Sequence, residues 1–243
     1  MVIDHAAVGL IEQSELASGV AWSLCGTAMR LVGRVAFPLF AFMIAEGAAH
    51  TRDRRRYALR LLLLAVISEI PFDLVAGGTW LFPVDQNTVF TLLLGLLAVW
   101  AGDLICGTGS GVSYGNREKT GDGGRKAVGQ RRFPLEYERY IRVLAAVPFG
   151  LAAYYLKTDY GFMGVLLIVI LYTLRTEPQL RTAVCAAFLF CMYMDFYGAA
   201  ACVAIFLINR YNGEKGSGSG RIVYLFYPLH LLVIRGIKMA VGL

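Results

Sequence analysis

The chain has 243 residues, of which 57% are hydrophobic and only 16% charged, with a formal net charge of +6. Its mean hydropathy is +0.59. Soluble domains carry about 25% charged residues, so this composition excludes a soluble globular protein and indicates an integral membrane protein. Lys and Arg cluster in loops and do not alternate with exposed aromatics, so the positive charge does not indicate nucleic-acid binding. We expect an all-α, polytopic helix bundle in the lipid bilayer.

The first elements are unusual in length. Residues 1–11 form an apolar segment that rises only about 16 Å as a helix, half of a hydrocarbon core, so we expect a re-entrant piece or part of a span. No basic region precedes it, so no cleavable signal peptide is expected. Residues 12–27 are small and polar and predict a loop with one short element. Residues 28–49 form the second span, where Pro38 frees the carbonyl of Arg34 and predicts a bend.

Further apolar stretches bring the total to about nine membrane segments. They are residues 57–76, 87–106, 141–156, 160–174, 182–208 (split at residues 195–198, which contain Asp195) and 222–241. Basic loops fall at 50–56, 107–139, 175–181 and 209–221. The alternate loops carry almost no Lys or Arg, so the basic loops and the N-terminus are predicted in the cytoplasm and the C-terminus outside. We expect one transmembrane domain, 1–243, whose cytoplasmic loop 107–139 carries a surface helix at 135–140.

Common catalytic motifs are absent from the sequence. The five cysteines form no C-x-x-C pair, and most lie in apolar runs, which favours small buried hydrophobes over metal or disulfide chemistry. The chain has no P-loop, no H-E-x-x-H and no nucleophile elbow. We therefore predict no metal and exclude the ATPase, zinc-protease and serine-hydrolase classes.

Polar residues of three spans are predicted to meet at one depth. Arg34 lies about 9 Å, Asp73 about 5 Å and Glu69 about 10 Å below the same outer edge. Glu69 and Asp73 are four residues apart and share a helix face, and a buried arginine needs such partners. We expect an Arg34–Glu69/Asp73 cluster that opens toward the outer leaflet. Gln86 and Asn87, at the outer start of the next span, are placed to join it and bind substrate.

A second polar group lies near the cytoplasmic end. Glu46 and His50 are four residues apart, and Arg52, Arg54 and Arg55 follow in the basic loop. Guanidinium groups bind phosphates through charge-assisted hydrogen bonds, so this region is a candidate vestibule for an anionic molecule. The competing interpretation is a helix end with solvated polar groups.

Two histidines lie in apolar surroundings. His5 follows Asp4 in the first segment, and His230 is in the middle of the last span. A neutral imidazole accepts a proton near physiological pH, so His5 is a candidate general base and His230 a candidate substrate-binding residue. For both, a structural buried histidine is the competing interpretation.

Several sequence blocks occur together over nearly the whole chain. They are residues 3–5, 33–42, 46–47, 50–52, 68–74, 86–87, 90–92, 159–161, 164–166, 211–213 and 226–231. In this order they resemble the TraX family, membrane proteins associated with acetylation of conjugative pilin, within the wider membrane acyltransferase-3 group. Family members usually have a longer apolar lead before the first block, which predicts an upstream start or a truncated first helix.

The resemblance implies a multi-pass protein of the bacterial cytoplasmic membrane that uses acetyl-CoA. We expect acetyl transfer from cytoplasmic acetyl-CoA, held by residues 52–56 and helped by the loop 117–132, to an amine or hydroxyl acceptor such as a pilin N-terminus. His5 is the base in this scheme, and Asp4 or a carboxylate of the Glu69/Asp73 cluster orients it. Arg34 stabilises developing negative charge or organises Glu69 and Asp73. Two alternatives stay open: a transporter or flippase of a small anionic substrate, and a non-catalytic pilus or envelope assembly factor.

Overall fold

The computed structural model describes residues 1–12, 19–82, 84–108, 132–194, 196–214 and 220–242. These residues form helices, with one isolated bridge between Gln86 and Thr158, so the expected all-α class is confirmed. The helices are α1 (Val2–Ala6), the π-helical η1 (Ala7–Glu12), α2 (Val20–Gly33), α3 (Ala36–His50), α4 (Arg54–Ala76), α5 (Thr88–Cys106), α6 (Leu135–Tyr155), α7 (Gly161–Thr173), α8 (Pro178–Tyr193), α9 (Phe196–Asn209) and α10 (Gly220–Val241).

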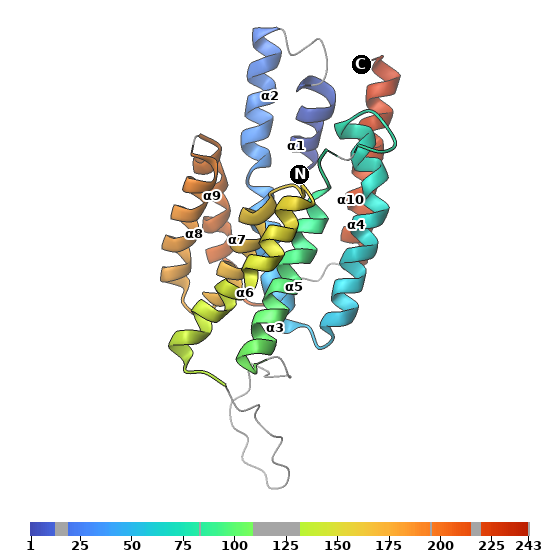
Figure 1. Ribbon diagram of the computed structural model, residues 1–243. Helices are drawn as coiled ribbons and strands as arrows, with labels where there is room; N and C mark the ends of the chain where they lie inside the picture. Colours follow the sequence, from blue (N-terminus) through green and yellow to red (C-terminus); the bar gives the residue numbers. More distant parts are fainter. Residues whose placement is uncertain (13–18, 83, 109–131, 195, 215–219, 243) are drawn as a thin grey trace.

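The helices run side by side, and the bundle has two distinct ends (Figure 1). The α3–α4 and α7–α8 turns lie at one end with the C-terminus of α5 and the start of α6. We call this the basic end, because its α3–α4 turn carries Arg52 and Arg54. The α4–α5, α6–α7 and α8–α9 connections lie toward the opposite end, where α2, η1 and the end of α10 project further (Figure 1).

Among the described residues, three helices are long and apolar enough to cross a membrane: Val20–His50, with 31 residues, Thr88–Cys106, with 19, and Tyr224–Val241, with 18. Gly161–Thr173 and Phe196–Asn209 are shorter apolar helices. The first of these spans is α2 continued by α3. The helix is interrupted at Arg34 and Val35, and Pro38 is the third residue of α3, where a missing N–H costs nothing. This interruption falls at the position where the bend was predicted.

The prediction of a loop at 12–27 is wrong for residues 20–27, which belong to α2. Residues 13–18 lie outside the described residues. The small residues of this stretch suggested a loop, but they bring helices together. A Cβ atom added to Gly26 would lie 3.3 Å from Ile11 of η1, so the glycine allows α2 to approach η1 closely. Tertiary packing here overrides the low helix propensity of glycine.

Other boundaries match the expectations more closely. The first segment is helical and short, as α1 and η1. The long stretch 182–208 splits as expected, where α8 ends at the left-handed Met194 (φ 50°) and α9 begins at Phe196. The expected surface helix 135–140 and the span 141–156 are one continuous helix, α6. Most of the expected loop 107–139, at 109–131, falls outside the described residues.

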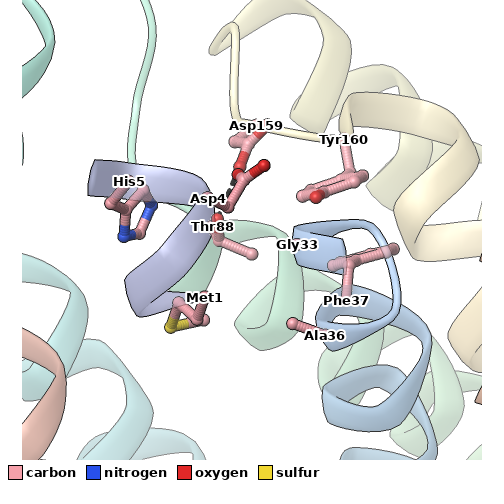
Figure 2. Close-up of a pocket in the computed structure, with 9 residues that line it drawn as sticks. All are labelled: Met1, Asp4, His5, Gly33, Ala36, Phe37, Thr88, Asp159 and Tyr160. Atoms are coloured by element: carbon pink, nitrogen blue, oxygen red, sulfur yellow. Dashed lines mark hydrogen bonds between the residues drawn. The ribbon is translucent and has the colours of Figure 1, made fainter. Parts of the chain in front are cut away.

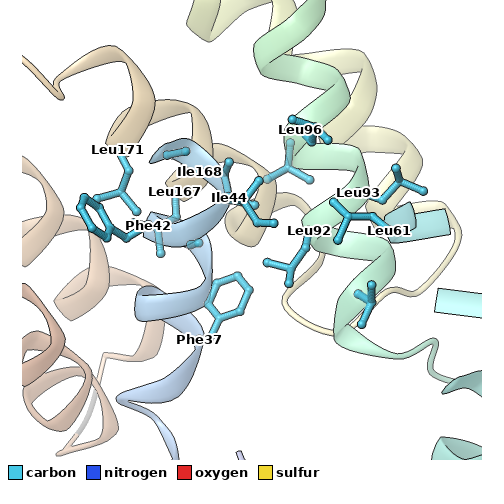
Figure 3. Packing of buried hydrophobic residues seen from close by; sticks show 14 of the residues in the cluster. Phe37, Phe42, Ile44, Leu61, Leu92, Leu93, Leu96, Leu167, Ile168 and Leu171 are labelled. Carbon is cyan, nitrogen blue, oxygen red and sulfur yellow. The ribbon is translucent and has the colours of Figure 1, made fainter. Parts of the chain in front are cut away.

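The hydrophobic core forms where α3, α5 and α7 pack against one another (Figure 3). Leu96 of α5 and Leu167 and Ile168 of α7 have no exposed surface. A Cβ atom on Gly95 would lie 2.3 Å from Cδ1 of Ile168, so this glycine allows α5 and α7 to pack in close contact. Because α7 is apolar on all sides, it is buried as a central helix. This core fixes the positions of the first residues of α5 and α7, which line the candidate site.

Candidate functional site

His5 and His230 form a hydrogen-bonded pair inside the bundle. Nδ1 of His5 lies 2.9 Å from Nε2 of His230. Nδ1 of His230 lies 3.0 Å from the carbonyl oxygen of Phe226. A carbonyl only accepts, so Nδ1 of His230 carries a hydrogen and, in a neutral ring, its Nε2 is an acceptor. His5 then donates from Nδ1, which leaves the lone pair of its Nε2 available to accept a proton.

Aromatic side chains enclose this histidine pair. Phe72 of α4 and Tyr227 of α10 meet the His5 ring edge-on, with ring centroids 6.3 and 6.2 Å away. The side chain of His5 is 8% exposed and that of His230 is 6% exposed. The two histidines come from opposite ends of the sequence, yet α1, α4 and α10 together hold them in a fixed relation.

Asp4 lies on the other side of α1, away from His5 (Figure 2). Its Oδ1 lies 3.0 Å from Nη1 of Arg30 and 3.9 Å from Nη2 of Arg34. A Cβ atom on Gly33 would lie 2.4 Å from Cβ of Asp4, so only glycine allows this approach. The expectation that Asp4 orients His5 is wrong, since neighbouring residues on a helix point about 100° apart and Asp4 faces α2.

Arg34 is held by a group of tyrosines as well as by the α1 carboxylate. Its Nη1 donates to the hydroxyl of Tyr160 at 3.2 Å. Its guanidinium carbon lies 5.7 Å from the ring centroids of both Tyr193 and Tyr197, within cation–π range. The ring of Tyr160 stacks on Phe37, with centroids 3.7 Å apart. This arrangement brings together a cation and a phenol from distant parts of the chain.

The α6–α7 connection presents Tyr160 and Asp159 to the site. Lys157 (φ 53°) and Tyr160 (φ 65°) both have left-handed backbone, a strained conformation that often occurs at functional sites. The backbone of Gln86 holds the connection, because its N–H donates to Lys157 and its carbonyl accepts from Asp159, both at 2.9 Å. The Thr88 hydroxyl donates to Oδ2 of Asp159 at 2.6 Å. Burial raises the pKa of the Asp159 carboxyl, and this hydrogen bond partly opposes the shift.

The predicted Arg34–Glu69/Asp73 cluster does not form among the described residues. Oε2 of Glu69 instead accepts from Nδ2 of Asn87 at 2.5 Å and from the Asn87 backbone N–H at 3.3 Å, so Asn87 contacts Glu69 without Arg34. Oδ2 of Asp73 accepts from the backbone N–H of Phe82 at 3.0 Å and so anchors the α4–α5 connection. The rise per residue predicts how deep a residue lies along its helix, but not the direction in which its side chain points around the helix axis. The carboxylate partner of Arg34 comes from α1.

A separate ionic network lies at the basic end. Oδ2 of Asp103 lies 2.7 Å from Nη2 of Arg54, and its Oδ1 lies 3.0 Å from Nε of Arg142. The hydroxyl of Tyr172 donates to the same carboxylate at 2.5 Å, and Arg142 also binds Glu138 at 3.1 Å. The Asp103 side chain is 1% exposed. The expectation that Arg54 binds a free anion is therefore wrong for this conformation, because Asp103 already neutralises it.

The other predicted vestibule residues lie at the surface of the basic end. Arg52 and Arg55 are exposed. Nε2 of His50 lies 3.3 Å from Oε2 of Glu46, and the His50 side chain is 64% exposed. These positions fit the interpretation of a solvated helix end, and they leave two cations accessible to an anion.

Sequence reasoning missed Arg30, Asp103, Arg142, Asp159 and Tyr160. Asp103 had a detectable signal, because a carboxylate inside an apolar span is costly and marks a partner. Arg30 precedes Arg34 by four residues and shares its helix face, which was also visible. Residues 159–161 were one of the family-like sequence blocks, but the sequence assigned no role to Asp159 or Tyr160, since their roles depend on the contact of the α6–α7 connection with the start of α5.

A small cavity lies where these groups meet (Figure 2). It has a volume of about 20 Å³ and its lining includes Asp4, His5, Thr88, Asp159 and Tyr160. A water molecule needs about 10–15 Å³ by this measure, so the cavity has room for a water and not for a substrate. The site as it stands is a closed polar centre between α1, α2, α5 and the α6–α7 connection.

The comparisons with known proteins concern the family of the chain. A family model described as TraX protein matches residues 1–108 and 132–238. The chain is similar to the probable fimbrial assembly protein FimC, serogroup H1, of Dichelobacter nodosus, at 24% identity over 98% of this chain and 91% of the relative. No solved structure shows a significant match. The matched residues cover both the histidine pair and the Asp4–Arg34–Tyr160 group, and the chain belongs to the TraX family.

Proposed function

We propose that this membrane protein is an acyltransferase that moves an acetyl group from acetyl-CoA to an amine or hydroxyl acceptor. The main support is the lone pair on Nε2 of His5, whose Nδ1 is engaged by His230. A buried imidazole with one nitrogen oriented and the other available is the arrangement that general bases require. Membership of the TraX family, which is associated with pilin acetylation, adds to this support.

In this proposal, Nε2 of His5 accepts the proton that the acceptor loses as its nitrogen or oxygen bonds to the acetyl carbon. The carbon–sulfur bond of the thioester then breaks, and His5 returns the proton to the departing sulfur, so the imidazole ends the cycle neutral. Arg34 and the hydroxyl of Tyr160 supply a cation and a donor for the negative charge on the acetyl oxygen.

The acceptor requires more room than the cavity beside His5 provides. The lining of this cavity comes from α1, the end of α2 and the start of α3 on one side, and from the start of α5 and the α6–α7 connection on the other. Substrate binding in this scheme separates α1 from that connection. An acceptor amine reacts there in its neutral form, because only the free amine has the nitrogen lone pair that attacks the acetyl carbon while one proton passes to His5.

The donor has candidate ligands at the basic end, which this proposal places in the cytoplasm of a bacterial inner membrane. Arg52 and Arg55 are exposed there and suit the phosphates of coenzyme A. Thr88 and Asp103 are fifteen residues apart on α5, so about 22 Å separates the two levels of the bundle. Donor binding at the basic end and proton transfer at His5 are therefore tested by separate experiments.

The experiment that tests the base is acetyl-CoA turnover by purified His5→Gln protein. Glutamine keeps hydrogen-bonding capacity but cannot carry a proton, so we expect a loss of about 10² to 10⁴-fold in kcat/KM. Val2→Gln, an exposed position on the same helix, is the matched control and should retain activity. Turnover by His5→Gln at the wild-type rate would overturn the proposal.

The donor site is tested by titrating acetyl-CoA against Arg52→Gln/Arg55→Gln protein. Weaker donor binding with an unchanged kcat at saturation would support it, whereas unchanged binding would show that the donor binds elsewhere.

A non-catalytic role in fimbrial assembly is the second candidate, because the curated relative is named a probable fimbrial assembly protein. The two candidates differ in their dependence on His5. If cells that carry His5→Gln protein assemble normal pili while cells without the gene do not, the assembly role is favoured over catalysis.

A further inference from the structure

A groove outside the candidate site runs between α4 and α10. Its volume is about 240 Å³. Arg60, Leu63, Leu64 and Ile67 line one wall, with the i, i+3, i+4, i+7 spacing of a single helix face. Tyr224, Leu225 and Pro228 line the other wall.

The groove lies on the surface of the bundle and is almost entirely apolar. Leu63, Ile67 and Leu225 are 54%, 62% and 64% exposed. Figure 1 shows α4 and α10 side by side at the edge of the bundle, so both walls belong to an outer surface. In a protein that spans a membrane, such a surface faces lipid chains rather than water.

Arg60 is the one cation in this apolar lining. Its side chain is exposed, and it makes no hydrogen bond or ion pair with any part of the chain that the structure describes. A guanidinium that faces hydrocarbon is costly unless it reaches the interface or meets an anion. Arg60 follows Arg54, the first residue of α4, by six positions, or about 9 Å along the axis, so its long side chain reaches toward the basic end.

We propose that this groove binds an anionic glycerophospholipid of the surrounding bilayer, with an acyl chain between α4 and α10 and the phosphate on Arg60. The apolar walls match an acyl chain, and the charge at the rim matches a phosphate. Basic pockets between membrane helices on the side with positive loops bind anionic lipid headgroups in this way. The inference concerns a surface away from His5 and does not depend on acyl transfer.

A bound lipid here has a structural consequence. The helices α4 and α10 carry Phe72 and His230, which both contact His5. A lipid acyl chain between Leu64 and Leu225 fills the space that separates α4 from α10 and supports the packing of these two helices. The lipid, bound at the outer surface of the bundle, thus stabilises the two helices that surround the histidine pair.

The test is native mass spectrometry of the full chain released from nanodiscs that contain equal amounts of phosphatidylglycerol and phosphatidylcholine of the same chain length. We expect retained phosphatidylglycerol in at least threefold excess over phosphatidylcholine. Arg60→Gln should remove this preference, and Arg55→Gln, an exposed arginine on the same helix outside the groove, should keep it.

The apolar walls are tested separately from the charge. Leu63→Trp fills the groove and should reduce retention of both lipids at least threefold, whereas Leu62→Trp, an exposed leucine of the same helix outside the lining, should not. Equal preference in Arg60→Gln and Arg55→Gln proteins would overturn the assignment of the phosphate. A lipid-free dimer that Leu63→Trp dissociates would overturn the proposal in favour of a second copy of the chain.

Discussion

At the scale of single residues, the environment of His5 determines what the site can do. His230 accepts from Nδ1 of His5 and itself donates to the Phe226 carbonyl, so both rings have one defined tautomer when neutral. His230 does not need to touch a substrate to matter. In the proposed reaction it is a positioning residue for His5, whereas the sequence suggested substrate binding.

This role makes a prediction for substitutions at His230. Glutamine places its side-chain oxygen near the position of Nε2 and can accept from His5, whereas alanine cannot. We expect His230→Ala to lower kcat/KM for acetyl transfer by about 10²-fold, and His230→Gln to recover most of the loss. Steady-state turnover of both proteins checks this. Equal losses in the two variants would show that His230 acts only through packing.

Gly33 gives a second residue-scale prediction. A methyl group there meets Cβ of Asp4 at 2.4 Å, so Gly33→Ala must push α1 away from α2. Overpacking of this kind costs about 1–3 kcal/mol of stability, and it also separates Asp4 from Arg30. Thermal unfolding in detergent measures the cost. Gly236→Ala is the control, because a Cβ atom there meets nothing within 4 Å; a similar loss in both variants would contradict the steric argument.

At the scale of elements, the network around Asp103 ties four helices together at the basic end, since Tyr172 of α7 also donates to this carboxylate. Arg54 begins α4, Asp103 lies in α5 and Arg142 lies in α6. Both arginines depend on the same carboxylate. A buried pair is weak evidence for net stability, but removal of one partner leaves unpaired charge behind.

We therefore expect Asp103→Ala to destabilise the bundle by about 3–5 kcal/mol, and Asp103→Asn to cost less, because the amide oxygen still accepts one hydrogen bond. Thermal unfolding and the yield of folded protein report the difference. Asp85→Ala, an exposed carboxylate in the α4–α5 connection, should change little. Equal melting temperatures for Asp103→Ala and wild type would refute the structural role of the network.

At the scale of the whole molecule, the two ends of the bundle differ in charge, and this difference predicts its orientation. The basic end should face the cytoplasm, and the C-terminus of α10, which lies toward the opposite end, should face outward (Figure 1).

Alkaline phosphatase fused to the C-terminus should therefore be active, because it folds only where its disulfides can form. A fusion after Gly213, in the α9–α10 connection, should be inactive. The reverse pattern would overturn the orientation and, with it, the placement of the donor site in the cytoplasm.

The sequence by itself determined the class of this protein and much of its local structure. Apolar length predicted the spans, Pro38 predicted the bend at Arg34, and the polar residues near Asp195 predicted the break between α8 and α9. These features are local, because hydrophobic length and backbone chemistry act within one segment. The sequence also marked His5 and Arg34 as unusual, because polar groups in apolar spans are costly.

Only the tertiary structure decided which polar groups meet. Depth along a helix follows from residue number, but direction around it and the neighbouring helix do not. Arg34 therefore pairs with Asp4 and Tyr160, and Glu69 with Asn87. For the same reason, the sequence did not predict the contact between His5 and His230. These residues lie at opposite ends of the chain and meet only because α1 packs beside α10.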